Sequence, residues 1–284
     1  MAKNALLVIG NGFDLQCGLK SGYEDFFDWL SKDDTRSKAN LWAVHFLNSP
    51  REGKRWADVE NRLQKAFNER QTRQSNINRN YVGITLIRFW HAIAIDFDKN
   101  LKKGGAAYPA IKEAEYVIKY IENRGKESFP FNSYWFLDEL MAFERQFAEY
   151  LQAEVSGNAN YLVNAAKLIE MMIHGESVHV LNFNYTNPFK PDASNPSSVK
   201  LSSMVAGVTN VHGTYANNNI IFGVDATAQL PSDTYIFTKT HRKMLQGTPA
   251  RALPRHVEEV KFYGHSLSQA DYSYFQSIFD YYNL

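Results

Sequence analysis

The first apolar stretch of the chain is a short run without a polar residue. Residues 5–9 read Ala-Leu-Leu-Val-Ile and end at Gly10. A wholly apolar run of this length, closed by glycine, is typical of a strand buried on both faces of a parallel sheet. The mostly apolar runs 178–183 and 257–263 are followed by an asparagine and a glycine. We therefore predict a central strand at 5–9, with the other two runs parallel to it.

Helical periodicity dominates the segment between the first two of these strands. Apolar residues recur every three or four positions from Tyr23 and again from Trp56, which predicts an amphipathic helix in each place. Residues 33–40 are polar and residues 187–204 are rich in Pro, Ser and Asn, so we predict loops there. Further helices are predicted at 81–98, 108–122, 134–153, 159–174 and 270–281, and short strands at 209–212 and 220–222.

The order of these elements predicts an α/β protein. One strand, a long helical segment and then several strands indicate a Rossmann-like open parallel sheet with a large helical insertion. We expect residues 1–20 and 176–284 to form a nucleotide-binding core, and residues 21–175 to form a helical module packed on it. The sequence stops just after its last predicted helix. Because such a sheet normally continues with another strand, the sequence leaves open whether the natural chain is longer.

Charge and cysteine content narrow the class of protein. The 31 Lys and Arg residues almost balance the 30 Asp and Glu residues, so there is no global basic field for nucleic acid, although a local patch is not excluded. The single cysteine, Cys17, can form neither an internal disulfide nor a cysteine zinc cage, and it fits a reducing compartment. No run approaches the roughly 20 apolar residues of a membrane span. We expect a cytoplasmic protein without a metal site or membrane attachment.

The turn after the first predicted strand carries the first candidate site. In Gly10-Asn11-Gly12-Phe13-Asp14, the glycines would let backbone amides approach an anion, and a following helix would add its positive end. Leu15 stands where the full dinucleotide fingerprint has its third glycine. A tight turn leaving a strand explains the same residues equally well. Asp14 could cap the next helix or bind a ribose hydroxyl.

Three later turns repeat this placement of polar residues behind a strand. Asn182 and Asn184 close one predicted strand, where sites of parallel sheets lie, although an Asx turn would also place asparagine there. His212 could be a general base, but a single histidine is more often structural. Gly264, with the following His265 and Ser266, repeats the strand, glycine and helix design.

Two further features allow more than one interpretation. Residues 234–257 contain Lys239, Arg242, Lys243, Arg251 and Arg255 and no acidic residue. This stretch could face a phosphate or form a solvated surface. Glu60 shares a helix face with Trp56, and its carboxylate either reaches water or a site.

In this order, the motifs resemble those of AbiH-type phage abortive-infection proteins. The resemblance covers both ends of the chain well and the helical middle poorly. It implies a role in defence against phage. The segments that carry it are 7–15, Gly18-Leu19, 23–26, 56–60, 182–186, His212-Gly213, 222–225 and 264–267.

A more remote resemblance is to sirtuin-like NAD-consuming domains. In that family a Gly-Ala-Gly turn, an asparagine at a strand end and a His-Gly pair follow one another, and the bacterial defence members add a late Gly-Tyr-Ser-Leu turn. The sequence departs from the family at Asn11 and Thr186, and it lacks the four-cysteine zinc module of sirtuin deacylases, which argues against protein deacylation. The corresponding positions here are Gly10, Gly12, Asn184, His212, Gly264 and Ser266.

The resemblance implies NAD as substrate or ligand, and an NAD glycohydrolase that depletes NAD during infection. Asn184 would position ribose or water, His212 would take the proton, and Asp14 would stabilise positive charge developing on the ribose. We expect these strand ends to line one pocket with His212 facing the surface, so that His212→Ala would leave the fold intact. The expected binding residues are Gly10, Asn11, Gly12, Phe13, Asn182, Gly264, His265 and Ser266.

Two other functions stay open. A non-catalytic sensor would hold a nucleotide intact and pass a signal through the helical module. A nucleic-acid-acting effector would use the basic stretch 234–257 and bind in a salt-dependent way, but the near-zero net charge and the lack of metal ligands count against it. The sequence leaves open which nucleotide is bound, whether a phage-derived trigger exists, and whether the chain forms a homo-oligomer.

Overall fold

The computed structural model describes most of the chain in five segments. These are residues 3–48, 133–225, 232–246, 253–267 and 271–284, together with Val59, Glu60, Leu63 and Tyr120. The chain divides into two compact units. The first unit comprises residues 1–25, 147–221 and 245–284, and the second comprises residues 26–146 and 222–244.

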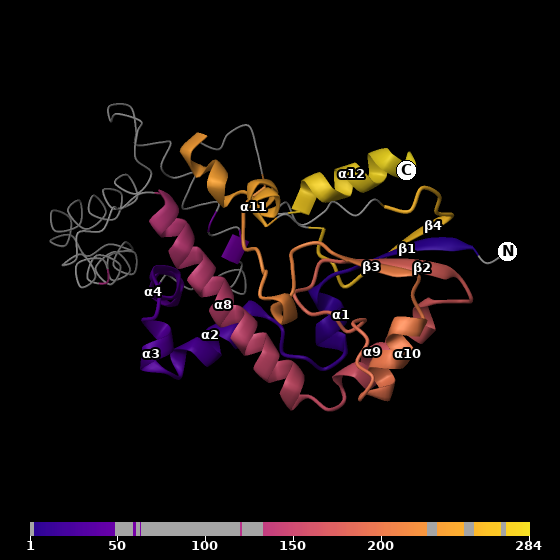
Figure 1. Cartoon of the computed structure of the whole chain (residues 1–284), viewed down its shortest axis with the longest axis horizontal. Coiled ribbons are helices and arrows are strands. Elements are labelled where there is room, and N and C mark those ends of the chain that lie inside the picture. The colour runs from indigo at the N-terminus through magenta and orange to yellow at the C-terminus, as the bar shows by residue number, and fades with distance from the viewer. Residues whose placement is uncertain are drawn as a thin grey trace, which may run out of the picture. The chain divides into compact units, whose positions relative to one another are not determined.

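The first unit contains an open sheet of four parallel strands (Figure 1). The strands are β1 (Asn4–Ile9), β2 (Ser177–Asn182), β3 (Gly207–Asn210) and β4 (Glu259–Tyr263), in the spatial order β3-β2-β1-β4. Strand β1 pairs with β2 on one side and β4 on the other. The prediction of an α/β protein with a central strand at 5–9, parallel to its two neighbours, is therefore confirmed.

The two faces of β1 explain why residues 5–9 of the strand are all apolar. Leu7 and Ile9 pack on one face against α1 (Asn11–Gln16), α9 (Tyr161–Met172) and α10 (Pro196–Ser203). Leu6 and Val8 pack on the other face beside residues of α12 (Tyr272–Tyr282), which Figure 1 shows on the opposite side of the sheet from α9 and α10. Burying one such side chain stabilises the fold by about 1.5–3 kcal/mol. A charge at any of residues 5–9 would thus disturb one of two cores.

The predicted helices in the described segments are present. Helix α2 (Tyr23–Ser31) begins at the residue where the periodicity begins, and α8 (Ser133–Gly157) covers the predicted 134–153. Helices α9 and α12 lie within about two residues of their predicted bounds. The predicted helix 81–98 lies outside the described residues. So do most of 108–122 and of the helix from Trp56, of which Val59, Glu60, Leu63 and Tyr120 are described as helical.

Two segments predicted as loops each contain a short helix. In the segment 33–40, α3 (Asp34–Ser37) begins behind Asp33, whose carboxylate accepts hydrogen bonds from the amides of Thr35 and Arg36. In 187–204, Asn195 caps α10 in the same way, and Pro196 occupies the first helical turn. Polar composition concealed these helices, although Asp or Asn as N-cap and Pro directly after it are known helix-start signals.

The late strand predictions need correction. Strand β3 covers Gly207–Asn210 and ends before the predicted 211–212. The predicted strand 220–222 is absent. Phe222 shows the reason, because its N–H donates to Glu144 Oε1 at 2.6 Å and its carbonyl accepts from Arg242 Nη1 at 3.0 Å. Side chains satisfy the backbone there, so no partner strand is needed.

The second unit packs around aromatic side chains. Its described elements are the remainder of α2, α3, α4 (Leu41–Asn48), residues 133–146 of α8, the 3₁₀ helix η4 (Ser232–Phe237) and α11 (Lys239–Leu245). The Phe143 ring lies 5.4 Å from Phe26, 5.3 Å from Phe46 and 5.7 Å from Phe222, measured between ring centroids. These contacts join α2, α4 and the 222–225 motif to α8.

Within the described segments, no helix combines the length and the apolar character that a membrane span requires.

Candidate functional site

Asp14 lies buried just beyond the carboxyl end of β1. Helix α1 begins at Asn11, directly after the strand, with Gly10 as its N-cap. Asp14 therefore falls inside the first turn of α1, and its side chain is only 1% exposed. The suggestion that Asp14 caps the next helix is wrong, because its carboxylate bonds to other elements.

Two hydroxyl groups hold the Asp14 carboxylate. Thr186 Oγ1, from the turn after β2, donates to Asp14 Oδ2 at 2.7 Å. The Tyr161 hydroxyl, from the first turn of α9, donates to Asp14 Oδ1 at 2.7 Å and lies 3.2 Å from Thr186 Oγ1. Each carboxylate oxygen thus accepts one hydrogen bond from a neutral donor.

Burial dominates the ionisation of Asp14. Removal from water raises the pKa of its carboxyl group from 3.8 to about 6, and the donors Thr186 and Tyr161 and the nearby Asn184 amide lower it only in part. The same burial, together with the Asp14 charge, raises the pKa of the Cys17 thiol to about 12 and that of the Tyr161 hydroxyl well above its ordinary value. Asp14 can therefore take up or release a proton near neutral pH.

A cavity of about 80 Å³ opens beside Asp14. At about 30 Å³ of liquid volume for each water molecule, it has room for roughly two or three waters, or for a group of similar size. Its walls come from α1, from Ser21 and the first residue of α2, from α8 and from the turn after β2. The lining residues are Asn11, Asp14, Ser21, Tyr23, Phe147, Leu151, Phe183, Asn184, Tyr185 and Thr186.

Asn184 places an unsatisfied amide in this cavity. Its side chain is 3% exposed, and neither Nδ2 nor Oδ1 makes a hydrogen bond of normal geometry to a described residue, although the amide lies close enough to Asp14 to lower the pKa of that carboxyl group. Leaving a buried polar group in this state costs about 1–3 kcal/mol. An unsatisfied donor and acceptor beside a carboxylate are the kind of groups that a polar ligand or water would satisfy.

Asn182 shapes the turn that presents Asn184. Its Oδ1 accepts from the Asn184 backbone N–H at 3.0 Å, which is the Asx turn considered from the sequence. Its Nδ2 donates to the Thr186 carbonyl at 2.7 Å and to Asn210 Oδ1 at 2.9 Å. The side chain of Asn182 is thus used within the turn, and it is not among the groups that line the cavity.

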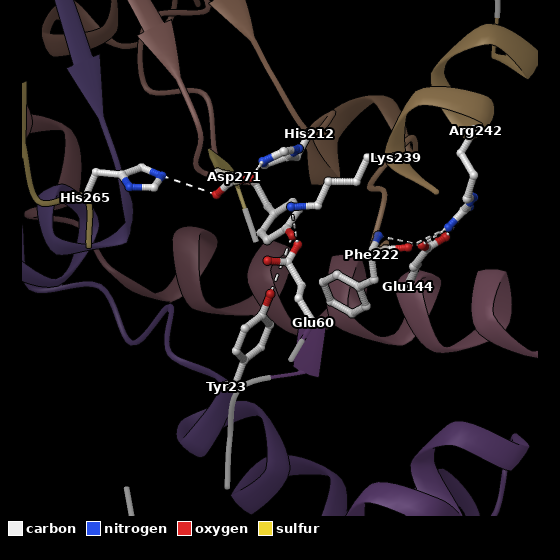
Figure 2. A network of polar contacts seen from close by, with 10 residues as sticks. Tyr23, Glu60, Glu144, His212, Phe222, Lys239, Arg242, His265 and Asp271 are labelled. Carbon is white, nitrogen blue, oxygen red and sulfur yellow. Dashed lines mark hydrogen bonds and ion pairs between the residues drawn. The ribbon is translucent and has the colours of Figure 1, made fainter. Parts of the chain in front are cut away.

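His212 belongs to a neighbouring histidine–aspartate cluster (Figure 2). His212 Nε2 lies 2.8 Å from Asp271 Oδ1, and His265 Nε2 lies 3.4 Å from Asp271 Oδ2. The Leu267 N–H donates to His265 Nδ1 at 3.0 Å, so Nε2 of a neutral His265 carries the proton and faces the carboxylate. Asp271 lies at the N-cap position of α12 and not inside the helix.

The side chain of His212 is buried and is not among the cavity-lining groups. This corrects the expectation that it faces the surface. Phe183 links the two places, since it lines the cavity and its ring centroid lies 5.4 Å from that of His212 and 4.7 Å from that of His265. Phe183 therefore contacts the histidine cluster and also lines the cavity that holds Asp14 and Asn184.

The glycine turns contact each other through their backbones. The Gly12 N–H donates to the Gly264 carbonyl at 2.8 Å, and the Gly10 N–H donates to the Tyr263 carbonyl at 3.0 Å. The Phe13 N–H donates to the Gly10 carbonyl at 2.8 Å. Three of the amides expected to face a phosphate thus already have partners, which gives these glycines a packing role that requires no ligand.

The remaining predicted binding residues lie in different surroundings. Asn11 lines the cavity, and its Oδ1 accepts from Ser21 Oγ at 2.5 Å. Phe13 lies in the core, His265 belongs to the cluster around Asp271, and Ser266 is exposed. Of the predicted binding residues, only Asn11 is among the cavity-lining groups.

In the second unit, two of the five basic residues in the stretch 234–257 form buried ion pairs. Lys239 Nζ lies 2.9 Å from Glu60 Oε1, with the lysine side chain 1% exposed. Arg242 binds both carboxylate oxygens of Glu144, one of them at 2.7 Å (Figure 2). Arg251 lies outside the described residues. These pairs leave Lys239 and Arg242 unavailable to an external phosphate, and they place Glu60 in an ion pair.

Tyr161 and Thr186 were not predicted as site residues from the sequence. In the sequence, Thr186 belongs to the 182–186 motif and departs from the sirtuin-like pattern, and Tyr161 adjoins the apolar stripe of α9. The one feature that could have indicated Tyr161 is its hydroxyl group, a polar group at the start of an apolar stripe.

No group of three or more His, Cys, Asp or Glu side chains that could hold a metal ion occurs in the described segments.

Comparison with known proteins gives one match. The family model described as Bacteriophage abortive infection AbiH matches residues 6–284 of the chain. No curated protein and no solved structure matches it.

Proposed function

The chain belongs to the bacteriophage abortive infection AbiH family, and from that premise we propose that it is a phage-defence effector that hydrolyses NAD. The reaction would take place at the cavity formed by Asp14 and Asn184. The observation that carries the proposal is the buried Asn184 amide, which makes no hydrogen bond of normal geometry to a described residue and lines the same cavity as the carboxylate.

The chemistry of the carboxylate fits cleavage of a glycosidic bond. When the nicotinamide–ribose bond breaks, its electron pair leaves with nicotinamide and positive charge builds on the ribose. An ionised Asp14 in a poorly hydrated site would stabilise that charge. Water then bonds to the ribose carbon and loses a proton. A carboxylate with a pKa of about 6 is mostly ionised at pH 7 and can accept this proton.

The amide of Asn184 fits the polar part of the same substrate. It offers one donor group and one acceptor, which match a ribose hydroxyl or the attacking water. The cavity volume of about 80 Å³ is below the roughly 300–1,000 Å³ that encloses a whole ligand. The cavity would therefore hold the reacting end of NAD and leave the rest of the dinucleotide outside it.

The sheet gives further support. Its order β3-β2-β1-β4 is that of the first strands of dinucleotide-binding Rossmann sheets, in which ligands bind beyond the carboxyl ends of the strands. Asp14 and Asn184 both follow such ends. His212 remains a second candidate for the proton acceptor, because its ring packs against Phe183 and Tyr185, which line the cavity.

The test is nicotinamide release from NAD by the purified chain, alone and with extract of phage-infected cells. We expect release under at least one condition, and its loss in Asp14→Asn and Asn184→Ala. Asn217→Ala, at an exposed position, is the matched control and should keep the wild-type rate. Full activity of both cavity variants would overturn the assignment of the site.

The nucleotide sensor remains the alternative. If the wild-type chain releases no nicotinamide under either condition but binds NAD and returns it intact, as judged by mass spectrometry, hydrolysis is wrong and the sensor replaces it.

A further inference from the structure

We propose that Tyr161 and Thr186 are positioning residues that hold the Asp14 carboxylate ionised and aimed at the cavity. The inference rests on the proposed function, because it concerns the group assigned there to the reaction. Neither residue belongs to the glycine turns or to the histidine cluster.

The two hydroxyls bind different oxygens of the carboxylate and approach it from different sides of the site. Tyr161 reaches Asp14 Oδ1 from the core, where it packs with Phe13 and Cys17, and it does not line the cavity. Thr186 reaches Asp14 Oδ2 from the cavity wall. An ionised carboxylate has about four lone-pair sites. One hydroxyl on each oxygen restrains the plane of the carboxylate and leaves lone-pair sites for the Asn184 amide, water or substrate.

Three separate elements must meet for this arrangement. Asp14 comes from α1, Tyr161 from α9 and Thr186 from the turn after β2, and all three side chains are at most 1% exposed. A hydroxyl donor favours the charged form of its acceptor. Loss of either hydroxyl should therefore make Asp14 harder to ionise and free its carboxylate to rotate.

The titratable groups around Asp14 make this effect measurable. They are Cys17 at the C-cap of α1, Tyr161 on α9 and Tyr215 on the 3₁₀ helix η3 (Tyr215–Asn217), each with a pKa raised by burial and by the Asp14 charge. All three stay neutral below pH 8. Within this described group, only Asp14 changes its charge between pH 4 and pH 8, so the other three groups do not overlap a titration of the Asp14 carboxyl group in that range.

The experiment compares Tyr161→Phe and Thr186→Val with the wild-type chain. A hydrogen bond to a charged group corresponds to roughly one pH unit of displacement in its acceptor. We expect the acid limb of the pH–rate profile to move upward by about one unit in each variant. Nicotinamide release would then fall by nearly tenfold below pH 6 and stay close to wild type at pH 8 and above.

Two control variants separate positioning from general damage. Thr186→Ser keeps a hydroxyl and should return the acid limb to its wild-type position. Tyr150→Phe removes another buried phenol, which donates to the Lys20 carbonyl at 2.6 Å, and should leave the limb unchanged. Thermal unfolding of each variant checks that the fold is retained.

A second readout does not require activity. In protein labelled with ¹³C at aspartate carboxyls, the Asp14 signal is assigned by its loss in Asp14→Asn and then titrated. We expect its midpoint to rise by about one pH unit in Tyr161→Phe and in Thr186→Val. An unmoved midpoint in both folded variants overturns the positioning role. If the midpoints move but the wild-type chain never releases nicotinamide, the hydrolase fails and the control of Asp14 ionisation stands.

Discussion

The backbone N–H of Gly12 donates to the carbonyl oxygen of Gly264 at 2.8 Å, which joins the turn after β1 to the turn after β4. A Cβ atom built on Gly12 would lie 2.6 Å from the Gly264 Cα, and one built on Gly264 would lie 2.4 Å from the Phe13 nitrogen. Gly264 also has a φ of +66°, which favours glycine. Both turns need glycine because their backbones touch.

Gly12→Val should therefore destabilise the fold, and not merely block a ligand. Crowding of a packed region typically costs about 1–3 kcal/mol, and the obstacle here is backbone that cannot rotate away. We expect a lower urea midpoint for Gly12→Val. Gly157→Ala is the control, because nothing lies within 4 Å of its Cβ position at the end of α8, and it should be neutral or slightly stabilising. Unchanged stability of Gly12→Val with lost NAD binding would instead favour the phosphate-binding role.

Asp14 should make the unfolding free energy depend on pH. Its pKa is raised from 3.8 to about 6, so between these values the folded state binds more protons than the unfolded state. The contribution of Asp14 to the free energy of unfolding is therefore fully present below about pH 4 and is lost as pH rises through 6. By pH 7.5 the loss is on the order of 3 kcal/mol.

Asp14→Asn removes the titrating carboxyl group. Its free energy of unfolding should therefore rise relative to that of the wild type as pH increases from 4 to 7.5. Urea unfolding of both proteins across that range measures the difference. A stability difference that stays constant with pH would show that burial does not raise the pKa of Asp14.

Asn182, which ends β2, and Asn184, which follows it, should have different effects on stability when each is replaced by alanine. Asn184→Ala removes an amide that makes no hydrogen bond of normal geometry to a described residue, so we expect unchanged or higher stability and a loss of activity of about 10²-fold through a misplaced substrate. Asn182→Ala removes three hydrogen bonds and should cost about 2–3 kcal/mol. Chemical unfolding and nicotinamide release, measured side by side, distinguish these roles. Equal effects of both variants on stability would contradict the assignment.

The role of His212 is better tested by a substitution that keeps a hydrogen-bond donor than by alanine. Because its imidazole is buried against Asp271, His212→Ala would leave a buried carboxylate short of a partner and cost several kcal/mol. His212→Asn keeps a donor, and its stability should lie nearer to that of the wild type. If His212 accepts the proton, the rate falls by about 10²–10⁴-fold in His212→Asn. A full rate in a folded His212→Asn protein would assign the proton to Asp14.

Much of the fold could be predicted from local pattern. Strand β1 and helices α2, α8, α9 and α12 follow from periodicity, because burial of one face or of both faces repeats along the segment itself. Helices α3 and α10 were missed because their start signals, Asp33 and Asn195, stand in polar stretches that were interpreted as loops. The absence of a strand at 220–222 could not be predicted, since Glu144 and Arg242 bind Phe222 from other parts of the chain.

For the site, the sequence by itself determined that Asp14 and Asn184 follow buried strands, and therefore that both lie near the carboxyl edge of one parallel sheet. Only the tertiary structure decided what these residues meet there. It brought Tyr161 to Asp14, buried His212 against Asp271, and paired Lys239 and Arg242 with carboxylates. The physical reason is that strand ends are encoded locally. Desolvation, hydrogen-bond partners and the pKa of a carboxyl group instead depend on segments that are distant in the sequence.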